Sequence, residues 1–341
     1  TALLSQHIGD LDTLETFDYY RLAIRHFEAL GRKRPKILAH DFHPHYLSTR
    51  YAQEQNGVQL VGIQHHHAHV AACLAENGRT DRCIGLALDG TGFGPDGTVW
   101  GGEILMADLK DFTRAGHFTP VRLPGGDAAI RNPARMALAY LFAVYGDKFP
   151  EVAAKLGLSL PDLEARVLHK QLTTGWHSPL TTSAGRLFDA VAAATGICRR
   201  RSYEGQPALE LEMAADLEEH GFYPAEVYQG KKTLVLDTLA IFRGAVEDRL
   251  AGRDNRIIAA RFHQSLAAGL TRLCLELRER TGLNLAALSG GVFQNALLLT
   301  LLKTRLTREG FEVLTHKLVP PNDGGLSLGQ AAAAAARLGP G

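Results

Sequence analysis

An apolar strand that ends in an acid and runs directly into a glycine-rich turn is the feature that most restricts the fold of this sequence. Residues 82–90 read RCIGLALDG, and residues 99–109, VWGGEILMADL, are also strand-like. The Asp96-Gly97 pair between them is a common two-residue hairpin signal. The pattern predicts an antiparallel β-hairpin whose first strand places Asp89 where the sheet meets the turn.

Strands and helices alternate along most of the chain, which is typical of an α/β protein. Buried strands are expected at 35–40 and 58–63, with a helical stretch between them, and a third antiparallel strand at 112–121. Helices are predicted where apolar residues recur at helical spacing, at 132–146, 161–175, 183–196 and 254–281. The chain then returns twice to strand, turn and helix, at 285–306 and 311–338.

The length of 341 residues is enough for two lobes, each with its own core. We expect residues 1–130 to form an N-terminal α/β lobe, and residues 131–341 a helical insert and a second α/β lobe. Ligands bind such proteins in a cleft at the carboxyl ends of strands. The formal net charge of +1 gives no support for nucleic-acid binding through bulk charge. The longest apolar runs are too short to span a bilayer.

The four cysteines, Cys73, Cys83, Cys198 and Cys274, lie far apart and form no C-x-x-C pair. This distribution favours reduced, buried thiols over a zinc ribbon or a disulfide framework. A cytoplasmic protein is therefore expected.

The glycines after Asp89 allow two interpretations. Gly90-Thr91-Gly92-Phe-Gly94 matches the start of a dinucleotide-binding fingerprint, but a strand follows it and not a helix, so the Rossmann interpretation fails. A plain tight turn and a hairpin whose backbone N–H groups face a phosphate both remain possible.

Two further glycine-rich turns lie near the end of the chain. A buried strand ends at Ser289-Gly290-Gly291 before a helix, where glycines allow close approach to a phosphate and the helix N-terminus favours anions. A purely structural turn is the alternative. Asp323 precedes a glycine pair and an alanine-rich helix, so it is either the N-cap of that helix or a functional acid.

Residues 64–69, QHHHAH, hold four of the fifteen histidines at the start of a predicted helix. His65 and His69 have the i,i+4 spacing of two ligands on one helix face. The H-E-x-x-H pattern of metalloproteases is absent because position 66 is His. His66 and His67 are expected to point elsewhere.

Two imidazoles and one or two carboxylates at strand ends make a mixed N/O site suited to Fe or Zn, with positions open for substrate. A second cluster at 40–46, HDFHPHY, offers His40, Asp41, His43 and His45. This cluster is either structural or faces the substrate, and the sequence leaves the choice open.

Six motifs in order along the whole chain resemble the C-terminal catalytic region of the HypF family of hydrogenase-maturation carbamoyltransferases. They are SQHIGDLDTLETFDYY (5–20), QHHHAH (64–69), LALDGTGFGPDGTVWGGE (86–103), LPGGDAAIRNPARMAL (123–138), GRLFDAVAAATGI…YEGQPA (185–208) and LSGGVFQN (288–295). The resemblance implies the two-lobed fold of the tRNA threonylcarbamoyl transferase Kae1/TsaD, within the actin–hexokinase–Hsp70 superfamily of nucleotide-binding proteins.

The resemblance also implies roles for particular residues. The metal ligands would be His65, His69, Asp89 and Asp323, of which the first three, with Arg131 of the AIRNP segment, would be catalytic. Residues near the phosphates would be Gly90, Thr91 and Gly92. Residues near the ribose would be Gly185, Asp189, Glu204 and Gly205. Residues at the adenine side and phosphates would be Ser289, Gly290, Gly291 and Asn295.

The implied reaction is the transfer of a carbamoyl group from carbamoyl-adenylate, made from carbamoyl phosphate and ATP, to the C-terminal cysteine of a partner, HypE. The product would supply the cyanide ligands of [NiFe]-hydrogenase. The implied cofactors are Fe or Zn and the AMP part of the adenylate, with Mg²⁺ as a further candidate. Upstream acylphosphatase-like, zinc-finger and YrdC-like domains occur in the family, so this sequence is expected to be a piece of a longer protein.

Three rival functions remain open. The tRNA-modifying relatives read N-H-L-E-G-H at the histidine motif and serine-glycine-glycine at the hairpin, where this chain has Asp89-Gly90-Thr91. An O-carbamoyltransferase acting on a small molecule is a second rival, and a non-catalytic nucleotide-binding module, which needs no metal quartet, is a third. Near-neutral charge speaks against an RNA substrate.

Overall fold

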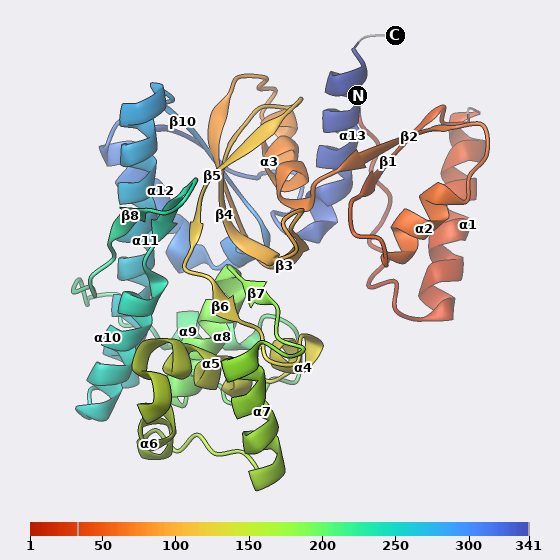
Figure 1. The fold of residues 1–341 in the computed structure, drawn as a ribbon. Coiled ribbons are helices and arrows are strands. Elements are labelled where there is room, and N and C mark those ends of the chain that lie inside the picture. Colours follow the sequence, from red (N-terminus) through yellow and green to blue (C-terminus); the bar gives the residue numbers. More distant parts are fainter. Residues whose placement is uncertain (33, 340–341) are drawn as a thin grey trace.

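The computed structural model describes residues 1–32 and 34–339 and shows a mixed α/β protein built from three parts (Figure 1). A small N-terminal unit lies beside a central sheet, and a group of helices lies at one end of that sheet. Among the helices in the described ranges, none has the length and apolar composition needed to cross a membrane.

The N-terminal unit consists of α1 (Leu14–Gly31), β1 (Ile37–Asp41), α2 (Leu47–Gln53) and β2 (Gln59–Ile63). β1 and β2 form a separate parallel sheet, with Asp41 opposite Ile63. Both predicted strands and the helix between them are confirmed, but the expected burial is wrong. Only the last residue of each strand is buried, whereas Ile37 is 41% exposed and Leu60 40%.

The central sheet has nine strands and begins from the predicted hairpin. β3 (Cys83–Phe93), β4 (Val99–Ala107) and β5 (Phe112–Phe118) pair antiparallel in sequence order, which confirms the hairpin and the third strand. β10 (Leu285–Ser289) pairs parallel with β3, and β11 (Glu312–Leu314) pairs parallel with β10. The remaining strands are β6 (Val121–Arg122), β7 (Leu180–Thr181), β8 (Val227–Gln229) and β9 (Leu234–Leu236).

This sheet takes strands from both sides of residue 130, the predicted boundary between the lobes. β3 lies between β4, its sequence neighbour, and β10, almost 200 residues later in the chain. β3 and β10 are parallel, so their carboxyl ends lie at the same edge, with Ser289 opposite Ala87. The turns after both strands therefore meet at one place.

Two helices lie between the sheet and the N-terminal unit: α3 (His65–Glu76) and α13 (Leu326–Leu338) (Figure 1). They pack very closely, since a Cβ atom on Gly329 of α13 would lie 1.8 Å from the carbonyl oxygen of Ala68. On the sheet side, Val70 of α3 fills the space next to Gly85 of β3. The two helices are therefore fixed both to each other and to the sheet.

The other helices lie on the opposite side and at one end of the sheet. They are α4 (Asp127–Arg131), α5 (Pro133–Tyr145), α6 (Phe149–Lys155), α7 (Asp162–Thr174), α8 (Ala184–Thr195), α9 (Gln206–Ala214), α10 (Thr238–Leu250), α11 (Asn255–Thr281) and α12 (Ala296–Arg308). Asn132 caps α5 by accepting from Ala134 N–H, as its Asn-Pro start suggests. Three short 3-10 helices are η1 (Gly146–Lys148), η2 (Gly291–Gln294) and η3 (Asp323–Gly325).

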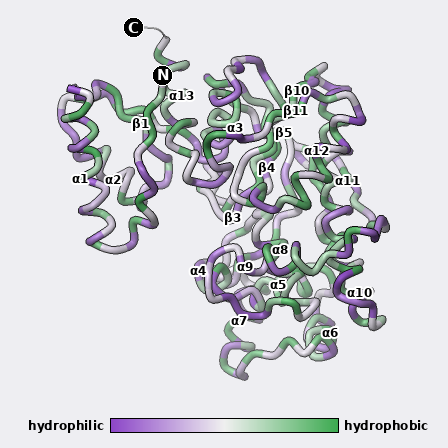
Figure 2. The backbone as a smooth tube through the Cα atoms, turned by 180° about the vertical axis from the view of Figure 1, so that it is seen from behind, coloured by the Kyte–Doolittle hydropathy of each residue, from purple (hydrophilic) through white to green (hydrophobic). Residues whose placement is uncertain are grey.

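The strand β3 separates two apolar cores because its side chains alternate between the two faces. Ile84, Leu86 and Leu88 belong to the larger core, which includes α5, α8, α11 and α12. Cys83 and Ala87 face the core formed with α3. Figure 2 shows the hydrophobic residues along these central elements and hydrophilic residues on outer helices such as α7.

Candidate metal centre and nucleotide site

Helix α3 brings the two predicted histidine ligands together at its first turn. Gln64 caps the helix, because its side-chain oxygen accepts from His67 N–H at 2.9 Å. The i,i+4 spacing then places the rings of His65 and His69 on one face, with centroids 5.0 Å apart. Both side chains are only 1% exposed.

A bulge in β3 brings the first carboxylate to these imidazoles. Leu88 pairs with Gly102 and Gly92 with Trp100, so Asp89, Gly90 and Thr91 lie opposite a single residue of β4. A bulge of this kind re-aims side chains.

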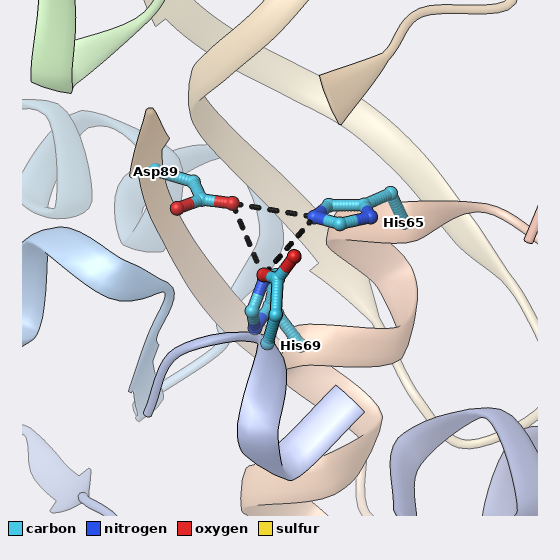
Figure 3. Close-up of side chains that lie close together, drawn as sticks. His65, His69 and Asp89 are labelled. Atoms are coloured by element: carbon cyan, nitrogen blue, oxygen red, sulfur yellow. Dashed lines mark hydrogen bonds and ion pairs between the residues drawn. The ribbon is translucent and has the colours of Figure 1, made fainter. Parts of the chain in front are cut away.

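The Asp89 carboxylate points at both metal-candidate rings (Figure 3). Asp89 Oδ2 lies 3.2 Å from His65 Nε2 and 3.4 Å from His69 Nε2.

The second carboxylate is Asp323, at the start of η3. Its Oδ1 lies 3.6 Å from His65 Nε2 and 3.4 Å from His69 Nε2. The alternative role as N-cap of the alanine-rich helix is wrong, because Gly325 occupies the N-cap position of α13, and Asn322 caps η3 by accepting from Gly324 N–H. Asp323 is free to face the histidines, and its side chain is 65% exposed.

The four side chains can hold one metal ion. One ligand atom from each residue lies within 4.8 Å of all the others. His69 Nε2 is buried and has no hydrogen-bond partner among the described residues. This nitrogen is therefore available to bind a metal ion. Two imidazole nitrogens and two carboxylate oxygens suit Fe or Zn.

The charges in this cluster stabilise one another. Burial opposes protonation of the imidazoles, but the nearby Asp323 carboxylate and hydrogen bonds with Asp41 and Asp89 raise the pKa of His65 well above its ordinary value. Contacts with Asp323 and Asp89 likewise raise the pKa of His69. The histidines in turn hold the pKa of Asp89 well below its usual value, although burial opposes this. A bound cation would replace the protons of the imidazoles.

Asp41 is a candidate positioning residue that the sequence interpretation left among several peripheral candidates. Its carboxylate is buried, with Oδ2 2.9 Å from His65 Nδ1, while Oδ1 accepts from His43 N–H at 2.8 Å. A carboxylate on the second nitrogen orients a metal-binding imidazole and fixes its tautomer. The signal was present in the sequence, since Asp41, like Asp89, is an acid that closes an apolar strand.

The other histidines of the two motifs have different surroundings. His66 packs against Trp100, and burial holds its pKa well below the ordinary value. His67 Nε2 lies 2.7 Å from the carbonyl oxygen of Asp108.

In the second cluster, the His43 ring stacks on Tyr46 at 4.1 Å, and His40 Nδ1 bonds to the carbonyl oxygen of Asp41. The metal-capable group found among the described residues includes none of the histidines His40, His43, His66 and His67.

Three of the predicted nucleotide segments converge around Asp89. Gly291 N–H donates to Asp89 Oδ1 at 3.2 Å, which ties the Ser-Gly-Gly turn to the metal candidate. Gly185, at the start of α8, packs on the bulge, since a Cβ atom there would lie 2.9 Å from Gly90 Cα. Ser183 Oγ also bonds to the carbonyl oxygens of Asp89 and Gly90. The bulge, the start of α8 and the Ser-Gly-Gly turn are therefore in direct contact at Asp89 and Gly90.

Other predicted nucleotide residues are engaged within the protein. Ser289 Oγ lies 2.8 Å from His316 Nε2, and Asn295 caps α12 and bonds to His263. Asp189 is buried, with Oδ2 2.7 Å from Arg186 Nε, and burial raises its pKa.

The last predicted positions differ in their packing. Gly92 has a packing reason to be glycine, because a Cβ atom there would lie 2.3 Å from His66 Cε1. Glu204 and Gly205 are exposed at the start of α9. Arg131 is exposed at the end of α4, where it lines a cavity of about 440 Å³ with Arg199, Arg200 and Arg201. This cavity includes none of the four metal-capable residues.

Comparison with known families matches almost the whole chain in two parts. Residues 1–76 match the HypF Kae1-like domain, and residues 85–330 match the second subdomain of the carbamoyltransferase Kae1-like domain. The first match ends at the last residue of α3, and the second begins within β3.

Individual relatives agree. The carbamoyltransferase HypF of Rhodobacter capsulatus is 40% identical over 99% of this chain and 44% of its own length. A carbamoyltransferase HypF homolog of Cupriavidus necator is 36% identical over 96% of this chain and 84% of its own length. A crystal structure of full-length HypF in the phosphate- and nucleotide-bound form matches with a TM-score of 0.92 and 40% identity, covering 97% of this chain and 51% of that one.

The chain spans less than half the length of several curated relatives, including HypF2 of Cupriavidus necator at 43%. Both family matches and the curated relatives agree with one another. The chain therefore belongs to the HypF carbamoyltransferase family, and it corresponds to the C-terminal Kae1-like domain of that family.

Proposed function

We propose that this chain transfers a carbamoyl group from carbamoyl-adenylate to the thiol of the C-terminal cysteine of HypE. The observation that carries the proposal is the bond from Gly291 N–H to Asp89 Oδ1. It joins the turn expected to hold the phosphate of the adenylate to the carboxylate expected to hold a metal ion. The carbonyl to be attacked and the leaving phosphate can then lie in one site.

The protein's own residues supply positioning. Asp41 holds the His65 ring so that Nε2 faces Asp89, and the bulge in β3 holds Asp89 against both imidazoles. When bound, a Zn or Fe ion supplies Lewis-acid polarisation of the carbamoyl oxygen and neutralises charge near the phosphate. Backbone N–H groups of the bulge, beside the Ser-Gly-Gly turn, would bind the AMP phosphate and reduce the cost of its departure.

The nucleophile is expected to come from the partner. Burial raises the pKa of Cys73 and Cys274 to about 12, so these thiols stay protonated. In the proposed step the partner's thiolate attacks the carbamoyl carbon after its proton has passed to solvent. A C–S bond forms, the C–O bond to the AMP phosphate breaks, and the electron pair leaves with AMP.

The setting of the reaction is also part of the proposal. Carbamoyl-adenylate would be made from carbamoyl phosphate and ATP by the YrdC-like part of the longer family members. Mg²⁺ would accompany ATP at that step. The four cysteines are free and buried, which supports a reducing, cytoplasmic environment.

A transfer assay tests the proposal. The chain, loaded with Zn²⁺ or Fe²⁺, receives pre-formed carbamoyl-adenylate and a peptide ending in cysteine, and thiocarbamate is detected by mass spectrometry. A peptide ending in serine, a small sugar and tRNA are the alternative acceptors. Thiocarbamate formed by wild type and not by His65→Ala supports the proposal. Preferred carbamoylation of a hydroxyl or of tRNA would favour one of the rival functions.

A further inference from the structure

Glu76, the last residue of α3, holds a loop segment, residues 316–319, to which no predicted function assigns a role. Its Oε2 lies 3.0 Å from His316 Nδ1, and the two side chains are 2% and 4% exposed. The same carboxylate accepts from the backbone N–H groups of Lys317, Leu318 and Val319. One buried carboxylate therefore holds four consecutive residues of the loop that follows β11.

The position of Glu76 in the helix is unfavourable by itself. A negative charge near the C-terminal end of a helix opposes the helix dipole. Burial also disfavours the ionised form, but bonds from Leu318 and Lys317 N–H and from His316 outweigh it and lower the pKa of Glu76. The stabilising contacts of this carboxylate are thus with the loop and not with its own helix.

His316 connects this anchor to the Ser-Gly-Gly turn. A carboxylate only accepts hydrogen bonds, so Nδ1 of His316 carries the proton and Nε2 accepts from Ser289 Oγ, 2.8 Å away. Next to this bond, Gly290 N–H donates to the carbonyl oxygen of Pro321 at 2.9 Å. The loop and the turn are therefore bonded at two points.

This loop carries Asp323, whose side chain is the most exposed of the four metal-candidate residues. The Asp323 side chain is 65% exposed, whereas those of His65 and His69 are 1% exposed and that of Asp89 12%. An exposed side chain on an irregular loop is placed by whatever fixes the loop backbone. Here Glu76, on the same helix that carries both histidines, bonds the backbone of residues 317–319, and Gly290 N–H bonds the carbonyl oxygen of Pro321, two residues before Asp323.

We propose that Glu76 and His316 are positioning residues that hold Asp323 opposite His65 and His69 and join its loop to the Ser-Gly-Gly turn through Ser289. The proposal rests on the metal site of the proposed function and adds the device that assembles it. Helix α3 supplies His65 and His69 near its start, and through Glu76, its last residue, it fixes the loop that carries Asp323. Loss of a partner that orients a metal ligand typically weakens metal binding by about 10–100-fold.

A metal-affinity measurement tests this role. Co²⁺ and Zn²⁺ dissociation constants are measured by chelator competition for wild type, Glu76→Ala, His316→Ala and the exposed control Glu279→Ala. We expect Glu76→Ala and His316→Ala to weaken binding by about 10-fold or more, and the control to have no effect. Glu76→Gln keeps one acceptor oxygen for the Lys317 and Leu318 N–H groups but places an NH2 donor against His316 and Val319, so it should restore only part of the affinity.

A double mutant separates positioning from a general loss of stability. If Glu76 acts through Asp323, then Glu76→Ala should weaken binding no further once Asp323→Ala is present. Additive losses, or a Glu76→Ala chain that binds metal as wild type does, would overturn the inference. Wild type that binds neither ion would instead overturn the metal site of the proposed function, and this inference with it.

Amide hydrogen exchange of the metal-free chain gives an independent readout. The anchor predicts slow exchange at Lys317, Leu318 and Gly290 in wild type, because each of these N–H groups donates to a bond in the network. Glu76→Ala should accelerate exchange at the first two, and exchange in α11 should stay unchanged. Equal protection in wild type and variant would show that the carboxylate does not hold the loop.

Discussion

The carboxylate of Asp41 and the ring of His65 form a buried hydrogen bond of 2.9 Å at Nδ1, on the opposite side of the ring from Asp89. The ring is therefore held between two acids, one from each sheet. Asp41 closes β1 of the two-stranded sheet, and Asp89 lies on β3 of the nine-stranded sheet. His65 is thus the residue through which the N-terminal unit contributes to the metal candidate.

Replacing Asp41 should weaken metal binding without removing a ligand. In Asp41→Ala the His65 ring loses the partner that fixes its orientation, and we expect the Zn²⁺ dissociation constant to rise about 10–100-fold. Asp18→Asn, an exposed acid of α1, is the control. Unchanged affinity in Asp41→Ala would mean that packing alone orients the ring.

Replacing His65 should abolish metal binding and transfer while the chain still folds. The variant His65→Ala removes one of two nitrogen ligands, and the remaining set cannot hold Zn²⁺ or Fe²⁺ in the same geometry. Elemental analysis of the purified chain measures the metal, and circular dichroism with thermal unfolding measures the fold. His220→Ala, at an exposed histidine, is the control. Full transfer activity in His65→Ala would contradict the metal assignment.

A methyl group at Gly290 should displace Asp89. Gly290 has φ of 104°, and an added Cβ atom would lie 2.2 Å from the carbonyl oxygen of Leu88, the residue before Asp89. We expect Gly290→Ala to lower the free energy of unfolding by about 3 kcal/mol and to weaken metal binding.

Gly97→Ala is the matched control for strain alone. Gly97 has φ of 79° but no atom within 4 Å of an added Cβ, so its substitution should cost only about 1 kcal/mol. Urea unfolding compares the two variants. Equal losses would show that the clash with Leu88 is relieved at no cost.

His263 should make the protein less stable in acid. Its ring is buried between the Ala259 carbonyl and the Asn295 amide, and burial lowers its pKa from 6.5 to about 4. Below its ordinary pKa, the unfolded chain takes up a proton that the folded chain excludes. The part of the free energy of unfolding that depends on neutral His263 is therefore fully present above the ordinary pKa. It is lost, by about 3 kcal/mol in all, as the pH falls toward the folded-state pKa.

Urea unfolding at several pH values measures this effect. The variant His263→Leu should lose stability less steeply than wild type between neutral pH and the folded-state pKa of about 4, whatever its stability at neutral pH. Parallel curves for the two proteins would show that His263 takes up its proton equally in both states.

The cysteines should be unreactive in the folded chain. Burial raises the pKa of all four thiols, that of Cys198 to about 11 and that of Cys73 to about 12. We therefore expect a thiol reagent such as DTNB to label none of them at neutral pH, and all four after unfolding in guanidinium chloride. Rapid labelling of one cysteine in the native chain would reopen the question of which thiol attacks.

The periodic features of this protein could be predicted from its sequence. The hairpin at β3–β4, the capped helix α5 and the long helix α11 each depend on residues close together in the chain. For the same reason the i,i+4 spacing of His65 and His69 was enough to predict that their rings share one face, since one helical turn brings them together.

The exposure of β1 and β2 and the place of β10 in the central sheet depend on contacts that no local sequence pattern reports. Apolar composition predicted two buried strands, but they form a small sheet of their own with one exposed end. β10 inserts beside β3 from the far end of the chain, so the central sheet extends past the expected boundary.

The amino-acid order alone specifies the chemical groups of the site: imidazoles on one helix face, acids at strand ends and glycines where backbones approach closely. Which acids meet those imidazoles depends on the folded molecule. Asp41, Asp89 and Asp323 are far apart in the chain, and they converge because parallel pairing, a bulge and an anchored loop place them there. Long-range pairing depends on the packing of the whole molecule, and a local stretch of sequence does not contain that information.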